Sequence, residues 1–289
     1  MLPISMISGI LFNQWIGLLG WLTPYLIFLM LTITFTRIRP SEFKITKFQW
    51  VMLAAQYLGC WVAYYSIYFF NPIVAEGAFL CIFIPTATAA PVITGMLGGS
   101  VSRLATFSLI SNITLAITAP FFLSWISVGS NIEFIDSFVK ICTQVAPLLL
   151  LPLVLAFALR YFAPKLHSAI SSHQTISFWL WAVALFIVMG KAVSFMIRQP
   201  VSNVNTMIML AGISLVVCLL QFYIGRKIGG KLGDKIAGAQ GLGQKNTILA
   251  LWISLTYLDP IISTAPATYI IWQNIINSWQ LWRKRNNML

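Results

Sequence analysis

The residues that could do chemistry lie in two polar segments that interrupt long apolar runs. One segment, residues 84–94, holds two prolines and three threonines, and the other, residues 238–247, is rich in glycine and amides and contains Lys245. Proline removes a backbone donor, and irregular backbone at membrane depth is tolerated only where protein or a wet cavity satisfies its polar groups. Such breaks present carbonyl and N–H groups that can bind an ion or an anionic group. The residues that we expect to form the two breaks are Pro85, Thr86, Pro91, Thr94, Gly241 and Gly243.

Lys245 is the residue with the strongest case for a function. A lysine at mid-membrane costs at least about 2.5 to 3.5 kcal/mol on insertion scales, so it should have a partner or a role. Its ammonium could act as a built-in cation beside Gln56 and nearby carbonyls, or face a cavity as the counter-charge of an anionic substrate. In the alternative interpretation the break lies nearer the cytoplasm and the side chain extends to water.

The composition of the chain indicates the elements that must position these residues. Of 289 residues, 59% are hydrophobic and 8% are charged, whereas an ordinary soluble domain has about a quarter charged residues. At about 20 residues a span, about nine spans fit and leave no room for a separate soluble domain. We therefore expect an all-α polytopic membrane protein with a single transmembrane domain over residues 1–289. The predicted spans are 12–36, 48–70, 74–97, 101–125, 140–162, 175–197, 204–225, 237–257 and 260–282.

Charge placement predicts the orientation of this domain. The Lys and Arg residues gather at the ends of apolar runs, mostly on one side, which favours an outside N-terminus and a cytoplasmic C-terminus in a multi-pass inner-membrane protein. Orientation explains the net charge of +12 better than a nucleic-acid partner does, and membrane lipid is a secondary partner for the basic run 283–285. Because one break falls in each half of the chain, we expect inverted repeats over about 1–127 and 138–289.

The sequence offers little for catalysis or for a resident cofactor. It contains no metalloprotease, nucleophile-elbow, phosphate-loop or dinucleotide motif, and its six acidic residues form no pair within a span. The four cysteines lie far apart in apolar runs and are interpreted as buried hydrophobic residues. We therefore predict that the chain is not an enzyme and has neither a disulfide framework nor a zinc site.

Three stretches resemble motifs of a known family. Residues 38–45, Ile-Arg-Pro-Ser-Glu-Phe-Lys-Ile, resemble a Lys-Pro-Ser-Asp-Phe loop. Residues 85–94 resemble the crossing-helix segment Pro-Gly-Gly-Thr-Ala-Ser-Asn-Val-Met-Thr, and residues 243–250 with 271–274 resemble a second one, Gly-Met-Gln-Asn-Ser with a later Trp-His-Asn. Over nearly its whole length the chain resembles the bile acid:sodium symporter family of bile-acid and organic-anion carriers and their bacterial relatives, in a nine-helix form.

The resemblance implies a fold and a substrate site. The fold has a panel domain and a core domain, two broken helices that cross in the core, and an elevator-like alternating-access movement. The substrate is an organic anion held near the crossing. Four positions correspond to the family's substrate contacts: Thr88, Asn246, Gln273 and Asn274.

The same resemblance implies that sodium coupling is altered. Gln56 corresponds to a sodium-site glutamine, but the other sodium-ligand positions read Ala90, Pro91, Gly241 and Lys245, and neither break contains a carboxylate. An ammonium would repel a sodium ion at short range. We therefore expect sodium coupling to be weakened or replaced by Lys245, and we assign no confident metal site.

These features predict a secondary active transporter of a small or amphipathic organic anion. One alternative is a conventional sodium-coupled symporter whose ligands have moved to the carbonyls around Ala87, Gln240 and Gln244. An alternative from another class is a membrane sensor or complex subunit that keeps the fold without transport. The sequence leaves open the substrate, the direction of transport, and whether the protein is a monomer or a homodimer. It also leaves open the coupling ion, which could be Na+, H+ or none, because protonation of Lys245 could replace sodium as the coupling event.

Overall fold

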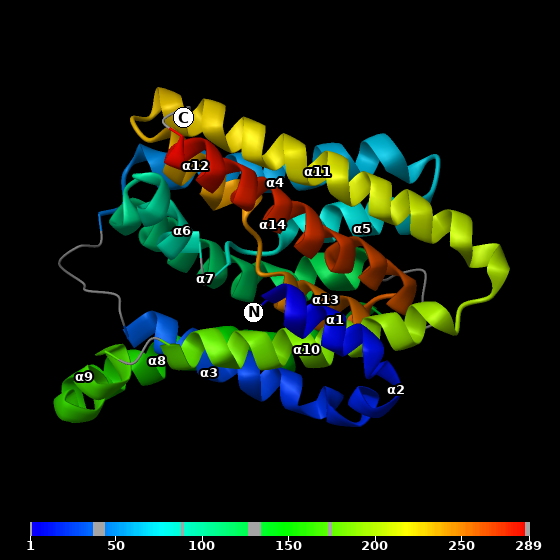
Figure 1. Ribbon diagram of the computed structural model, residues 1–289, viewed down its shortest axis with the longest axis horizontal. Helices are drawn as coiled ribbons and strands as arrows, with labels where there is room; N and C mark the ends of the chain where they lie inside the picture. The colour runs from blue at the N-terminus through cyan, green and yellow to red at the C-terminus, as the bar shows by residue number, and fades with distance from the viewer. Residues whose placement is uncertain (1, 37–43, 88–89, 127–133, 173–174, 287–289) are drawn as a thin grey trace. The chain divides into compact units, whose positions relative to one another are not determined.

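The computed structural model describes residues 2–36, 44–87, 90–126, 134–172 and 175–286, and every regular element in these ranges is helical (Figure 1). Four stretches in them are long and apolar enough to cross a membrane: Leu19–Thr36, Val101–Ile126, Ile141–Phe162 and Val201–Lys231. The chain is therefore an all-α membrane protein. These four stretches coincide with four of the nine predicted spans, and the other five spans remain predictions.

The chain divides into two compact units, and each unit takes segments from both halves of the sequence. The first unit comprises Met1–Pro40, Ile113–Gln199 and Leu251–Ile261, and the second comprises Ser41–Asn112, Pro200–Ala250 and Ile262–Leu289. Two helices, α7 (Val101–Ile126) and α13 (Thr247–Tyr257), contribute residues to both units.

The first unit is built around α10, which packs against α1 and α3, while α3 also packs against α8. Gly9 of α1 faces α10 so closely that an added Cβ would lie 2.6 Å from the Phe186 carbonyl oxygen. The predicted span 12–36 is not one continuous helix, because a 3-10 segment, η1, separates two α-helices. The helices of this unit are α1 (Leu2–Leu11), α2 (Asn13–Ile16), η1 (Gly17–Leu22), α3 (Thr23–Thr36), α8 (Phe134–Phe162), α9 (Pro164–Ser172) and α10 (Thr175–Ile197).

The second unit contains both interrupted segments. Its long helix α11 packs against α4, α5, α12 and α14 (Figure 1). A capping box starts α4, in which the Thr46 hydroxyl and the Gln49 side chain satisfy the first backbone donors. The remaining helices of this unit are α4 (Lys47–Tyr68), α5 (Pro72–Phe83), α6 (Ala90–Leu97), η4 (Val201–Asn203), α11 (Val204–Lys231), α12 (Lys235–Gly243) and α14 (Thr264–Arg285), while η5 (Pro260–Ser263) joins the two units.

A glycine-lined contact holds α11 against α12. An added Cβ on Gly225 would lie 2.2 Å from the Gly238 carbonyl oxygen, and one on Gly229 would lie 2.7 Å from the Gly238 Cα. Small residues four apart allow two helix backbones to approach in this way. The turn between the helices has Gly233 at a φ of +88°, and Asp234 then caps α12 by accepting from two backbone N–H groups. The two helices therefore meet main chain to main chain.

The two predicted interruptions are present, but the second is shorter than expected. The first separates α5, which ends at Phe83, from α6, which begins at Ala90. The second was expected over 238–247, yet α12 continues through Gly243, so only residues 244–246 are non-helical. In α12, Gly238 and Gly243 pack against α11, and Gly241 packs against Phe107 of α7. Of the residues expected in the breaks, Pro85 and Thr86 lie in one, Pro91 and Thr94 lie in α6, and Gly241 and Gly243 lie in α12.

Candidate functional site: the crossing of two interrupted helices

The two interruptions meet within the second unit and pair through main-chain atoms. Thr86 and Lys245 form an antiparallel bridge. Two hydrogen bonds of 2.9 Å flank it, from the Ala87 N–H to the Gln244 carbonyl and from the Asn246 N–H to the Pro85 carbonyl. We call residues 84–87 and 244–246 the crossing. Extended backbone inside a membrane protein needs partners from protein, and here each interruption supplies the other's.

The side chain of Lys245 ends at the C-terminus of α5. Its Nζ donates to the Ile82 carbonyl oxygen at 2.8 Å, and the residue is only 1% exposed. The last carbonyls of a helix lack intrahelical partners and carry partial negative charge, so an ammonium is favoured there. Among the residues described, this ammonium has no carboxylate partner. The structure thus buries the Lys245 amino group inside the protein, where it contacts backbone oxygen.

Two glutamines bind the neighbouring carbonyls at the same end of α5. The Gln56 Nε2 donates to the Phe83 oxygen at 2.9 Å and to the Ile84 oxygen at 3.2 Å. The Gln221 Nε2 donates to the Cys81 oxygen at 3.3 Å. With Lys245, these side chains supply a donor to each of the four successive carbonyls from 81 to 84. The end of α5 is therefore a fully occupied set of oxygen acceptors.

The C-terminus of α12 is satisfied in a similar way. The Thr86 hydroxyl donates to the Gly241 oxygen at 2.7 Å, and the Tyr269 hydroxyl donates to the Gly243 oxygen at 2.8 Å. The same tyrosine hydroxyl accepts from the Gln221 Nε2 at 3.0 Å. Gln221 consequently links the end of α5 to the end of α12.

Two of the predicted substrate residues hold the crossing in place. The Asn246 Oδ1 accepts from the Leu249 N–H at 3.3 Å and so caps the start of α13. The Gln273 Oε1 accepts from the Lys245 N–H at 2.9 Å, and both side chains are buried. The Asn246 oxygen thus accepts from the first turn of α13, and the Gln273 oxygen accepts from the backbone of the second interruption.

The other two predicted substrate residues are placed differently. The Asn274 Nδ2 donates to the Ile270 carbonyl of its own helix at 2.8 Å, so its amide is engaged within α14. Thr88 lies outside the described residues. The structure therefore brings Asn246 and Gln273 to the crossing and records no such contact for Asn274, while their role in substrate binding stays a prediction.

Buried acceptors without partners lie beside the crossing. The Gln240 Nε2 donates to Asn277 at 3.0 Å and to Gln280 at 2.9 Å, while its Oε1 has no partner among the described residues. The Gln244 Oε1 and the Thr94 Oγ1 are in the same situation. A buried unsatisfied acceptor costs about 1 to 3 kcal/mol, so these oxygens could favour a cation or a donor.

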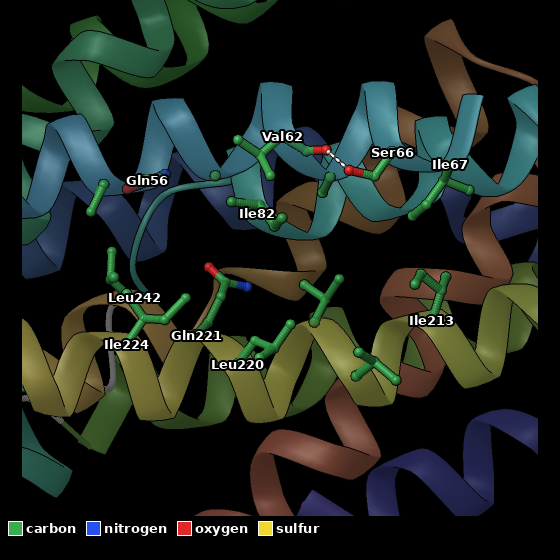
Figure 2. Close-up of a pocket in the computed structure, with 15 residues that line it drawn as sticks. Gln56, Val62, Ser66, Ile67, Ile82, Ile213, Leu220, Gln221, Ile224 and Leu242 are labelled. Carbon is green, nitrogen blue, oxygen red and sulfur yellow. Dashed lines mark hydrogen bonds between the residues drawn. The ribbon is translucent and has the colours of Figure 1, made fainter. Parts of the chain in front are cut away.

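An apolar cavity of about 290 Å³ lies between α4 and α11. Gln56 and Gln221, which cap the end of α5, stand on its wall together with Ile82 and Leu242. Figure 2 shows Gln221 extending from α11 into the space below α4, among aliphatic side chains. The capped end of α5 is thus bordered by a space that suits an apolar group.

Some residues of the site were missed by sequence reasoning. Gln221 and Tyr269 sit in apolar runs and had no motif to mark them, although an amide in the middle of a predicted span was a usable signal. Ser111 was also missed, and its hydroxyl donates to the Gln56 Oε1 at 3.3 Å. In the part of the chain that the structure describes, no group of three His, Cys, Asp or Glu residues could hold a metal ion. The polar chemistry of the crossing is that of amides, hydroxyls, carbonyls and one ammonium.

Comparison with known proteins adds no assignment: no family model matches the chain, and no curated protein matches it. The motifs quoted from the sequence and the geometry of the crossing therefore carry the functional argument.

Proposed function

We propose that this protein is a secondary active transporter of a small or amphipathic organic anion, of the bile acid:sodium symporter type, in which Lys245 replaces the coupling sodium ion. The observation that carries the proposal is the buried Lys245 ammonium on the Ile82 carbonyl, at the point where two interrupted helices cross. In the proposed topology, the protein spans the inner membrane nine times, with its N-terminus outside and its C-terminus in the cytoplasm.

The order of the helices supports a transporter built from inverted repeats. In each half a long helix precedes an interrupted pair and another long helix follows it: α4, α5, α6 and α7 in the first half, and α11, α12, α13 and α14 in the second. The packing also corresponds, since α4 packs on α5 and α11 packs on α12. Interrupted helices in matching positions of two repeats are typical of secondary transporters.

The contacts of Lys245 support its role as a built-in cation. Transporters of this kind coordinate a cation with unwound carbonyls and half-helix C-termini, and the Lys245 Nζ binds one such carbonyl. A sodium ion about 4 Å from this charge would be repelled by about 4 kcal/mol at an effective dielectric constant near 20. That repulsion would weaken sodium binding by about a thousandfold. The resident charge and a sodium ion therefore exclude each other at this position.

The same charge supports an anionic substrate. The ammonium has no carboxylate partner among the described residues, so it gives the crossing a positive potential. The half-helices α6 and α13 also begin beside the crossing, and helix N-termini attract anions through their free N–H groups and dipole. An organic anion would gain from both effects.

A conventional sodium-coupled symporter is the second candidate. The observation that favours it is the pair of buried acceptor oxygens, Gln240 Oε1 and Gln244 Oε1, which have no partners among the residues described. Both are on or just after α12, close in sequence to Lys245. A sodium ion held by these oxygens would leave Lys245 in its present role at the end of α5.

The test combines uptake and thermal stability. Purified protein in liposomes is screened with a panel of organic anions, in sodium and in potassium at equal ionic strength. We expect saturable uptake of at least one anion, equal in the two salts, and a thermal midpoint that does not respond to sodium. In Lys245→Gln, sodium at ten times its Kd should raise the midpoint by about 2 °C. Lys235→Gln, which removes an exposed lysine at the start of α12, the helix that precedes Lys245, should behave as wild type.

Two outcomes would overturn the proposal. Stabilisation and faster uptake of the wild type in sodium, but not in potassium, would establish the conventional symporter. Absence of uptake with every anion, together with stable co-purification of another protein, would favour a sensor or complex subunit.

A further inference from the structure

A second cavity, away from the crossing, lies between α11 and α14 of the second unit. Its volume is about 470 Å³, and it runs from Leu219 and Ile276 to Arg226 and Arg283. We call it the basic groove. The residues that line it include two arginines and no acidic residue, so its electrostatic preference is for an anion.

The two walls of the basic groove have the same pattern. On α11, Leu219 and Arg226 are seven residues apart, and on α14, Ile276 and Arg283 are also seven apart. Seven residues make about two helical turns, so each pair lies on one face with a separation of about 10 Å. Each wall thus places an arginine at one end of the groove and an aliphatic side chain at the other.

Aromatic residues accompany the basic end on both helices. The Lys227 Nζ lies 5.5 Å from the centre of the Tyr223 ring, and the Arg283 guanidinium lies 5.1 Å from the centre of the Trp279 ring. Tyr223 is 60% exposed and Trp279 is 52% exposed. Tyrosine and tryptophan with a nearby basic residue are typical of the headgroup level of a bilayer. The basic end of the groove is therefore suited to the membrane interface, and the aliphatic end to the hydrocarbon.

We propose that the basic groove binds one anionic phospholipid, with its phosphate between Arg226 and Arg283 and an acyl chain along Leu219 and Ile276. Guanidinium groups form paired hydrogen bonds with phosphate oxygens, and basic pockets between membrane helices bind anionic headgroups. The aliphatic end selects a lipid over a free phosphate, because a headgroup alone leaves that part of the groove unfilled. This site is independent of the proposed transport function.

The test measures lipid retention by native mass spectrometry. Wild-type protein is titrated with phosphatidylglycerol and with phosphatidylcholine of identical chains, and the same titration is made with Arg226→Gln/Arg283→Gln. The matched control is Lys231→Gln/Lys235→Gln, which removes two exposed charges that do not line the groove. We expect wild type to prefer phosphatidylglycerol, the groove variant to bind it about tenfold to thirtyfold more weakly, and the control to stay within about twofold of wild type.

Three results would overturn the proposal: no preference for phosphatidylglycerol in wild type, an equal loss in the control variant, or competition by glycerol 3-phosphate as effective as that of the lipid. If the double arginine variant does not fold, a second variant tests the site. Ile276→Trp keeps both arginines and fills the aliphatic end, so retention of phosphatidylglycerol should fall about tenfold. Unchanged retention in that variant would also refute the site.

Discussion

Gly225→Ala tests the main-chain contact between α11 and α12. The added Cβ would lie 2.2 Å from the Gly238 carbonyl oxygen and 2.9 Å from its carbonyl carbon. Ordinary contact begins at 3.4 Å, so the two backbones would have to part by about 1.2 Å. No side chain can rotate away, because the neighbouring atoms are backbone. We therefore expect the variant to be destabilised.

The size of this effect can be isolated with Gly212→Ala in the same helix. An added Cβ on Gly212 meets nothing within 4 Å. Both variants gain about 0.5 to 1 kcal/mol from the better helix propensity of alanine. Their difference is then the overpacking cost at Gly225, which is typically about 1 to 3 kcal/mol and belongs at the upper end where backbone is displaced.

The assay is thermal unfolding of the purified variants in detergent, followed by tryptophan fluorescence. At about 2.1 cal/mol/K of unfolding entropy per residue, a change of 1 kcal/mol shifts the midpoint of a chain of 289 residues by about 1.6 °C. The Gly225→Ala midpoint should therefore lie about 3 to 5 °C below that of Gly212→Ala. Equal midpoints for the two variants would refute the close approach of α11 and α12.

Three further substitutions test the satisfied helix ends. Gln56→Leu leaves the Phe83 and Ile84 carbonyls without their donor and should lower the free energy of unfolding by about 1 to 3 kcal/mol. Thermal unfolding measures this loss, and an unchanged midpoint would contradict the capping role. Tyr269→Phe removes only the hydroxyl that donates to the Gly243 carbonyl. We expect the free energy of unfolding to fall by about 1 kcal/mol and the backbone amides around the crossing to exchange hydrogen faster. Exchange at the wild-type rate would argue against a role of this hydroxyl in holding the crossing. Asp234→Ala removes the cap of α12 and the acceptor of the Ser100 N–H, so the free energy of unfolding should fall by about 1 to 2 kcal/mol in the same assay. Asp234→Asn keeps one cap oxygen, so its free energy of unfolding should fall less.

The sequence predicted the interruptions because their residues cannot make a simple span. Prolines at positions 85 and 91 remove backbone donors, and a lysine inside an apolar run needs a partner, so both facts are local. The pairing of Lys245 with a carbonyl near Gln56 was among the expectations, and the structure places both side chains at the end of α5.

What could not be predicted depends on which helices meet. Glycine is compatible both with irregular backbone and with close helix packing. The run 238–243 is therefore compatible with a break, whereas in the structure it is helical and its Gly238 lies against Gly225 and Gly229. The same limit applies to Gln221, whose role follows from the meeting of three helices that are distant in sequence. Spacing within one segment carries no information about such partners.

The attachment of Lys245 to its carbonyl has a consequence for energy conversion in the proposed carrier. A bound sodium ion leaves its site when its concentration falls, whereas the lysine ammonium is joined to the chain by covalent bonds. The cation position is then filled at every sodium concentration, and no sodium ion crosses the membrane with the substrate at this position. Such a carrier cannot use the free energy of a sodium gradient. Active accumulation of the anion would then depend on another coupled solute, such as a second anion that is exchanged for it.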